Sequence, residues 1–168
     1  MTDMSLSRVS QIICLSLALA LPLAAHAEGT NVAFGGLKAD ISLPVEVQAD
    51  SFSVNQSDGT AVFSGNVVVS QGEMRMTAAE ITVEYSTDGK AISRLIASGG
   101  VLLVNALDAA EAQNAVYTIA TGEVILTGSV VLTQGKAAMS GEKLIIDLTS
   151  GNGRMEGRVT TTFTPSGN

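Results

Sequence analysis

The chain has 168 residues, of which 46% are hydrophobic and 15% are charged, and its formal net charge at neutral pH is −7. This length is enough for one domain with its own hydrophobic core. The Lys and Arg residues are scattered rather than clustered, so the sequence lacks the electrostatic footprint of a nucleic-acid-binding protein or of a protein attracted to anionic membranes.

The first 27 residues have the composition of a secretory signal peptide. Arg8 gives a short positive region, residues 12–23 form an apolar run, and Ala25, His26 and Ala27 supply a small-x-small cleavage pattern. We expect cleavage after Ala27 and export of the remaining chain. The alternative is an uncleaved membrane anchor, but a spanning helix needs about 20 apolar residues.

Cleavage would remove Cys14 and His26, which are the only cysteine and the only histidine of the chain. Cys14 follows Ile13 rather than a small residue, so we do not expect lipoprotein processing. The exported chain would have no disulfide, although its compartment would permit one. Its stability must therefore come from a hydrophobic core.

The exported part divides into a flexible leader at residues 28–43, one domain at residues 44–164 and a short tail at residues 165–168. The end of the leader can add to the sheet of the domain. From Pro44 onward, apolar and polar residues alternate in short runs, as Val45 and Val47 do with Glu46 and Gln48. This period indicates half-buried strands. Glycine-containing turn signals recur about every ten residues, which is typical of a β-sandwich, barrel or roll.

One segment, residues 108–116, also has the composition of a helix. It contains four alanines, and alanine favours the helix intrinsically. However, Val116, Tyr117 and Ile119 continue it with strand-like alternation, and comparable stretches elsewhere read as strands. We therefore favour a strand and keep a short helix as the alternative.

A phrase of about ten residues recurs along the domain. Residues 63–72 read FSGNVVVSQG and residues 126–135 read LTGSVVLTQG, and looser copies occupy residues 97–105 and 155–163. The repeated glycines are Gly65, Gly100, Gly128 and Gly157. A repeat of this length indicates a stack of similar units, because one unit cannot bury its own apolar face. Each copy predicts a strand entered through a turn or a bulge.

The sequence offers little catalytic chemistry. The exported part has no cysteine or histidine, no G-x-S-x-G or S-x-x-K motif, and no calcium-loop motif. Glu80 and Glu84 would lie about 13 Å apart along a strand. We expect no catalytic residues, no metal and no cofactor.

The apolar strand residues on inward faces remain as functional candidates. They are either an ordinary core or the lining of an apolar trough, and the soft side chains of Met74 and Met76 suit an irregular apolar ligand. The candidates are Val67, Val69, Met74, Met76, Ile81, Val83, Leu103, Tyr117, Ile119, Val130 and Leu132.

The order of these motifs resembles the OstA-like family of periplasmic lipopolysaccharide transport proteins over essentially the whole exported chain. The matching phrases are PVEVQAD from Pro44, FSGNVVVSQG, MTAAEITV from Met76, LTGSVVLTQG, SGEKL from Ser140 and RVTTTFTP ending at Pro165. The phrase G-N-V-x-V-x-Q-G followed by A-[DE] is specific in combination, whereas a single copy is weak.

The resemblance implies an all-β fold, a single open antiparallel β-jellyroll, in the periplasm. It implies an apolar groove that shields the acyl chains of lipid A. The lipid-contacting positions of the family correspond to Ile41, Val45, Val47, Leu103, Tyr117 and Ile119. Together with the inward residues Val67, Val69, Met76, Val130 and Leu132, these form the predicted lipid-binding set.

The resemblance also implies head-to-tail assembly into a bridge between two membranes. We expect the N-terminal edge, residues 41–48, to join a component of the inner-membrane transport complex or a second copy. We expect the C-terminal edge, residues 158–164, to meet the next copy or the outer-membrane translocon. Two alternatives stay open. One is a scaffold module of the same system without its own carrier activity, and the other is an enzyme on a β-roll that acts on a polysaccharide.

Overall fold

A computed structural model describes residues 30–33, 37–55, 57, 59–106 and 108–163. The predicted signal peptide and the predicted tail lie outside these residues. The described part of the chain is built from strands, and none of its segments is a helix long and apolar enough to cross a membrane. The strands are β1 (Thr30–Ala33), β2 (Glu46–Gln48), β3 (Ser51–Asn55), β4 (Thr60–Gln71), β5 (Met74–Tyr85), β6 (Ile92–Asn105), β7 (Asp108–Thr118), β8 (Glu123–Gln134), β9 (Ala137–Asp147), β10 (Asn152–Glu156) and β11 (Thr160–Phe163).

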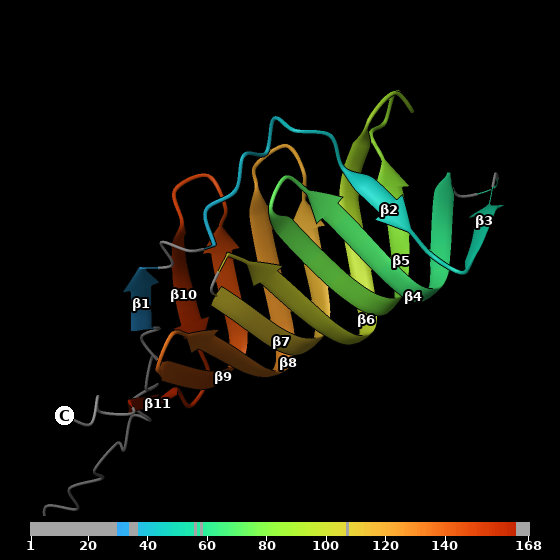
Figure 1. Cartoon of the computed structure of the whole chain (residues 1–168). Coiled ribbons are helices and arrows are strands. Elements are labelled where there is room, and N and C mark those ends of the chain that lie inside the picture. Colours follow the sequence, from blue (N-terminus) through green and yellow to red (C-terminus); the bar gives the residue numbers. More distant parts are fainter. Residues whose placement is uncertain (1–29, 34–36, 56, 58, 107, 164–168) are drawn as a thin grey trace, which may run out of the picture.

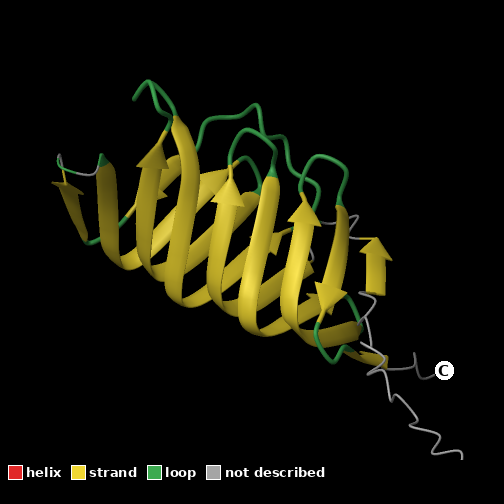
Figure 2. Cartoon of the chain, turned by 180° about the vertical axis from the view of Figure 1, so that it is seen from behind, coloured by secondary structure: helices red, strands yellow, loops and turns green. Residues whose placement is uncertain are grey.

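All of these strands belong to one antiparallel sheet with the order β1-β10-β9-β8-β7-β6-β5-β4-β2, in which β3 also pairs with β4 and β11 with β9. From β4 to β10, each strand pairs with the next one in the chain, as short hairpin connections require. Figures 1 and 2 show these long strands side by side from opposite directions. The predicted antiparallel all-β class is confirmed, and residues 108–116 belong to strand β7 rather than to a helix.

Three of the repeated glycines, Gly65, Gly100 and Gly128, lie in β-bulges in the middle of long strands, whereas Gly157 lies between β10 and β11. The register of the sheet shifts between Ser64 and Val67, and equivalent shifts occur along β5, β6, β7 and β8. The backbone is left-handed at the repeated glycines, with φ angles of 80° at Gly65 and 85° at Gly128, a conformation that glycine adopts at little cost. Each strand therefore bends at its bulge.

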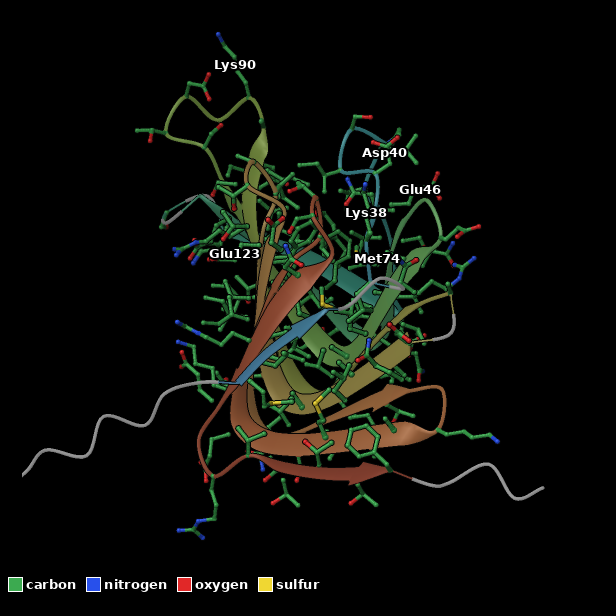
Figure 3. All side chains as sticks on the ribbon, turned by 90° about the vertical axis from the view of Figure 1, so that its left-hand side faces the viewer. Lys38, Asp40, Glu46, Met74, Lys90 and Glu123 are labelled. Carbon is green, nitrogen blue, oxygen red and sulfur yellow. The ribbon has the colours of Figure 1, made fainter. Side chains whose placement is uncertain are left out.

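The aligned bulges fold the sheet into two facing walls. The first wall contains β3, β10 and the strand halves that pair with them, including Thr60 to Ser64 of β4. The second wall contains β2, β11 and the other halves, including Val67 to Gln71 of β4. Viewed along the stack, the folded sheet forms a trough (Figure 3).

The core fills the space between the walls. Along the first wall, register pairs place one apolar residue of each strand in a continuous row: Ala61, Val83, Leu95, Tyr117, Val124 and Ile146. Along the second wall, the matching row is Val69, Met76, Leu103, Ala110, Leu132 and Met139. All twelve side chains are buried. Burial of such rows is the main force that holds the walls together.

The segment predicted as a flexible leader contributes to this fold. β1 pairs with β10 through four register positions, at the far end of the sheet from β2. Leu37 is fully buried in the core. The chain then crosses the length of the molecule before it enters β2, as the cyan segment of Figure 1 shows.

Candidate functional site

The predicted lipid-binding residues gather in one place, the space between the two walls. Seven of them are almost completely buried there, and four lie partly buried against the same cluster. The buried seven are Val67, Val69, Met76, Leu103, Tyr117, Val130 and Leu132, and the partly buried four are Ile41, Val45, Val47 and Ile119. We call the space between the walls the groove.

The sheet alone leaves the groove open along one side. This is the side away from the bulges, where the hairpin turns of the two walls lie. Residues 37–45, which we call the strap, lie across this side (Figures 1 and 3). The strap touches both walls. The Ala39 N–H donates to the Leu148 carbonyl of the first wall at 2.8 Å, and the Asn105 side chain of the second wall donates to the Lys38 carbonyl at 2.7 Å.

The strap alternates between inward and outward side chains like a strand. Leu37 is fully buried, and Ala39 and Ile41 pack against the core, while Lys38 and Asp40 are exposed. In Figure 3, Lys38 and Asp40 lie at the mouth of the trough. The strap therefore places apolar side chains in the groove and charged side chains in solvent.

A polar pair spans the groove beneath the strap. Tyr117 on the first wall donates its hydroxyl hydrogen to Gln71 Oε1 on the second wall at 2.6 Å. Gln71 Nε2 in turn donates to the carbonyls of Ile41 at 3.0 Å and Leu43 at 2.9 Å. Burial raises the pKa of Tyr117, and the bond to Gln71 opposes part of this shift. The pair thus joins both walls and the strap.

Gln71 is one of three buried polar residues that lie along one rim of the second wall. The other two are Asn105 and Asp108, and all three are at most 7% exposed. Asp108 Oδ2 accepts from Gln134 Nε2 at 2.8 Å, whereas Asn105 Oδ1 is buried without a hydrogen-bond partner. A buried acceptor without a partner is unfavourable, so this rim is a place where a ligand can add a bond.

Both ends of the sheet expose large apolar side chains, and those at the β3 end continue an inner row. At one end, Phe52 pairs with Phe63 across β3 and β4, with ring centroids 4.7 Å apart. Phe52 and Val54 are 56% and 57% exposed. At the other end, Phe163 on β11 is 73% exposed. The apolar interior therefore reaches solvent at the β3 end, whereas Phe163 is an exposed apolar side chain beside Ala137 at the other end.

Sequence reasoning missed Leu37, Gln71 and Asn105. The alternation of Leu37, Ala39 and Ile41 with polar residues was a usable signal, but it is short and lies in a glycine-containing segment. Gln71 is the glutamine of the repeated phrase, so its recurrence at Gln134 was also visible. Nothing in the local sequence distinguishes Asn105 from a turn residue.

Several charged side chains of the described residues form ion pairs, but they form no metal-binding group. Within the described ranges, no group of three or more His, Cys, Asp and Glu residues is placed to hold a metal ion. The ion pairs that the structure contains, such as Arg94 with Glu84 at 2.6 Å, lie between partly exposed side chains. Such exposed pairs contribute little to stability.

Comparisons with known proteins find a matching family model and similar sequences. A family model described as LptA/(LptD N-terminal domain) LPS transport protein matches residues 46–152. An uncharacterized protein of Rhizobium meliloti (strain 1021) is 26% identical over 141 residues, which cover 79% of this chain and 76% of that protein. The lipopolysaccharide export system protein LptH of Pseudomonas aeruginosa is 36% identical over 61 residues, which cover 36% of this chain and 34% of LptH.

The crystal structure of LptH has a similar fold. It is described as the LptA homologous periplasmic component of the conserved lipopolysaccharide transport device, and it superposes with a TM-score of 0.67 at 21% identity. The match covers 76% of this chain and 99% of the LptH chain. This likeness confirms the predicted jellyroll, and the family model confirms the resemblance seen in the sequence.

Proposed function

The chain belongs to the family of LptA and LptD N-terminal domain lipopolysaccharide transport proteins, and from this premise we propose that it carries lipopolysaccharide across the periplasm. The acyl chains of lipid A would lie in the groove, and the sugar and phosphate head would remain in solvent. The predicted signal peptide supports export to this compartment. No bond is made or broken in this function, which is therefore not enzymatic.

The observation that carries the proposal is the pair of apolar rows that face each other across the groove, the first of which reaches solvent at the β3 end through Val54. Burying one CH₂ group gains about 0.8 kcal/mol, so a chain of about a dozen carbons gains roughly 10 kcal/mol when fully buried. Partial burial would gain less and leave the chain free to slide. The proposed lipid contacts are Ile41, Val45, Val47, Val67, Val69, Met76, Leu103, Tyr117, Ile119, Val130 and Leu132.

Photocrosslinking in cells tests this function. A photoreactive amino acid at position 47 or 117 should capture lipopolysaccharide, because both side chains face the groove. The same amino acid at position 131 should not, because Val131 is exposed at the surface. Absence of adducts at 47 and 117, in an assay that detects them on an established carrier, would refute the carrier function.

We also propose that copies assemble head to tail through the ends of the sheet. β2 and β3 lie at one end and β11 lies at the other, and an outer strand can accept another strand by backbone pairing. Of the N-terminal edge predicted at residues 41–48, we now propose that only β2 pairs with a partner, since Ile41 and Leu43 belong to the strap. The predicted C-terminal edge gains a second element, since β1 covers the outer side of β10.

End-specific charges test the assembly. Val54→Lys and Phe163→Lys each place a cation in an exposed apolar end, and each should abolish concentration-dependent oligomers in sedimentation experiments. A mixture of the two variants keeps one intact pair of ends, so it should form dimers and stop there. Larger oligomers in either variant alone would contradict head-to-tail contact. The inner-membrane complex component and the outer-membrane translocon would use the same ends.

A second candidate function is a scaffold module that joins the transport system without carrying lipid itself. The observation in its favour is the complete burial of Val69, Leu103 and their neighbours beneath the strap. The two candidates differ in the crosslinking experiment, because a scaffold would yield protein adducts but no lipopolysaccharide adduct.

A further inference from the structure

The strap presents to the groove the same two kinds of group that an acylated sugar presents. Its apolar side chains point between the walls, led by the fully buried Leu37. Its carbonyls accept hydrogen bonds at the rim from Gln71 and Asn105. A fatty acyl chain linked through an ester or an amide likewise has an apolar part and a carbonyl oxygen at the junction with its head.

We propose that the strap is an internal substitute for the ligand, and that an acylated lipid binds by taking the strap's place. This inference rests on the proposed carrier function and adds the groups that recognise the lipid. The acyl chain occupies the positions of Leu37, Ala39 and Ile41. Its ester or amide carbonyl accepts from the side-chain amides of Gln71 and Asn105.

The geometry of Gln71 makes it selective for an acceptor. Its Oε1 accepts from the Tyr117 hydroxyl, which orients the amide so that both Nε2 hydrogens point to strap carbonyls. A ligand without a carbonyl would offer these buried donors only an ether or hydroxyl oxygen at its junction, and an ether oxygen is a weaker acceptor than a carbonyl. The groove therefore discriminates between chains with and without a carbonyl at their head.

Asn105 supports the same exchange and adds a second requirement. Its Nδ2 donates to the Lys38 carbonyl, while its Oδ1 is buried without a partner. A hydroxyl or an amide N–H next to the acyl carbonyl would supply the missing donor. The strap does not supply it, so an amide-linked or hydroxylated chain would satisfy this residue better than the strap does.

Two disaccharide detergents test the carbonyl requirement. Sucrose monododecanoate carries a 12-carbon chain on an ester, whereas dodecyl maltoside carries a 12-carbon chain without a carbonyl. Calorimetry below micelle formation should show tighter binding of the ester by roughly threefold to tenfold, the range of one neutral hydrogen bond. Gln71→Met keeps a side chain of similar size and should lower the ratio of affinities, because only the Asn105 donor then remains for the ester carbonyl.

The ratio of the two detergent affinities separates recognition of the carbonyl from loosening of the strap. Gln71→Met also removes two bonds that hold the strap, but both detergents must displace the same strap, so this effect cancels in the ratio. Ser42→Ala is the matched control, because Ser42 lies on the strap and bonds only within it, to Asp40. It should leave the ratio unchanged. An unchanged ratio in Gln71→Met would overturn the proposal.

A reversible lock, formed by a disulfide between the strap and the first wall, tests whether the strap must leave the groove before a lipid binds. A Cβ placed on Gly122 would lie 3.1 Å from Ile41 Cγ2 and 3.0 Å from Thr149 Cγ2, so the strap and the first wall are adjacent there. In one molecule of the exported chain, cysteines at positions 41 and 149 would have no other cysteine to pair with. The oxidised protein should bind both detergents at least about tenfold more weakly, and reduction should restore binding.

The single-cysteine variants are the controls for the lock. A separate variant, Leu37→Ala, removes most of the strap's buried side chain and should strengthen binding of both detergents. Equal binding by oxidised and reduced protein would overturn the proposal, as would detergent binding by neither wild type nor Leu37→Ala. Failure of the carrier function is a separate result. In that case lipopolysaccharide would never be captured by photocrosslinking, even though the lock controls detergent binding.

Discussion

The repeated sheet and the strap cover the same core but are held to it very differently. Strands β4 to β9 join their neighbours through ladders of nine or ten register pairs. The strap meets the walls through a few hydrogen bonds and a few apolar side chains, of which only Leu37 is fully buried. We therefore expect the walls to stay folded when the strap opens, because local opening requires only local contacts to break.

The largest expected effect comes from a charge inside the second wall. Val69 is fully buried between Val47 and Met76 of the neighbouring strands. Val69→Asp would bury a carboxylate without a partner, so we expect a loss of about 4 kcal/mol or failure to fold. Urea denaturation measures the change. Val131→Asp, at an exposed position of β8, should change stability by about 0.5 kcal/mol or less, and wild-type stability in Val69→Asp would contradict the inner face.

Truncation of two fully buried leucines compares the regions directly. Leu126 lies in β8 and Leu37 lies in the strap, and both are 0% exposed. Leu126→Ala should lower the free energy of unfolding by about 3 kcal/mol, as core cavities do. Leu37→Ala should lower it less, because the strap can detach without unfolding the walls.

Hydrogen exchange at the Ala39 amide completes this comparison. That amide is bonded to Leu148 only while the strap is in place. Leu37→Ala should speed its exchange markedly, whereas Leu126→Ala should speed it only in proportion to global stability. Equal changes in global stability for both variants would mean that strap and walls unfold as one unit.

The bulges that fold the walls provide a third test. Gly99 and Gly100 are neighbours in one bulge, with φ angles of 82° and 88°. A Cβ on Gly99 would lie 2.6 Å from Ala79 Cβ, whereas a Cβ on Gly100 would have open space. Gly100→Ala should cost about 1 kcal/mol for the left-handed backbone alone. Gly99→Ala should cost about 2 kcal/mol or more, since a steric clash is added. Equal losses would show that the backbone strain dominates.

The sequence was informative about the walls because their signals are local and repeated. Alternation around Val67 and Val69 was enough to predict an inward face, and the repeat identified the positions of Gly65 and Gly128. The sequence could not distinguish a turn at the start of a strand from a bulge in its middle, because both place a glycine in the left-handed backbone conformation. The folding of the sheet into two walls follows from that distinction.

The strap was less predictable because its partners are distant in the chain. Asn105 bonds to a residue 67 positions away, and Tyr117 bonds to Gln71 across 46 positions. A single sequence carries no record of such pairings. The pairing of β1 with β10 is another long-range contact of this kind, which is why residues 28–43 read as a leader.

The bond that crosses the groove gives a smaller effect that depends on pH. Tyr117→Phe removes the hydroxyl that meets Gln71, so at pH 8 we expect a loss of about 1 kcal/mol. Because burial raises the pKa of Tyr117 above its ordinary value of 10.0, the folded protein favours the neutral phenol. The stability that this provides is complete below pH 10 and is lost as pH rises further.

Denaturation curves at a series of pH values therefore test the hydrogen bond between Tyr117 and Gln71. The stability gap between wild type and Tyr117→Phe should narrow above pH 10, because only the wild type has this phenol to ionise. A gap that stays constant from pH 8 to pH 11 would mean that Tyr117 is not held in the apolar groove.

The smallest expected effect concerns the turn that anchors the strap. Asp147 accepts hydrogen bonds from Thr149 and Ser150 in the turn after β9, and these bonds, with Thr149 the larger contributor, lower its pKa from 3.8 to about 2. The same turn presents the Leu148 carbonyl to Ala39. Since the folded state favours the carboxylate, its contribution is complete above pH 4 and is lost as pH falls toward 2.

Asp147→Asn should reproduce the acid state at pH 7. The exposed side chain makes the global effect too small to matter in denaturation, so the measurement is again exchange of the Ala39 amide. It should exchange faster in Asp147→Asn than in wild type at pH 7, and the two proteins should converge when both are compared below pH 2. Identical Ala39 exchange at pH 7 would show that the strap does not depend on this turn, and its attachment would then lie with Leu37, Gln71 and Asn105.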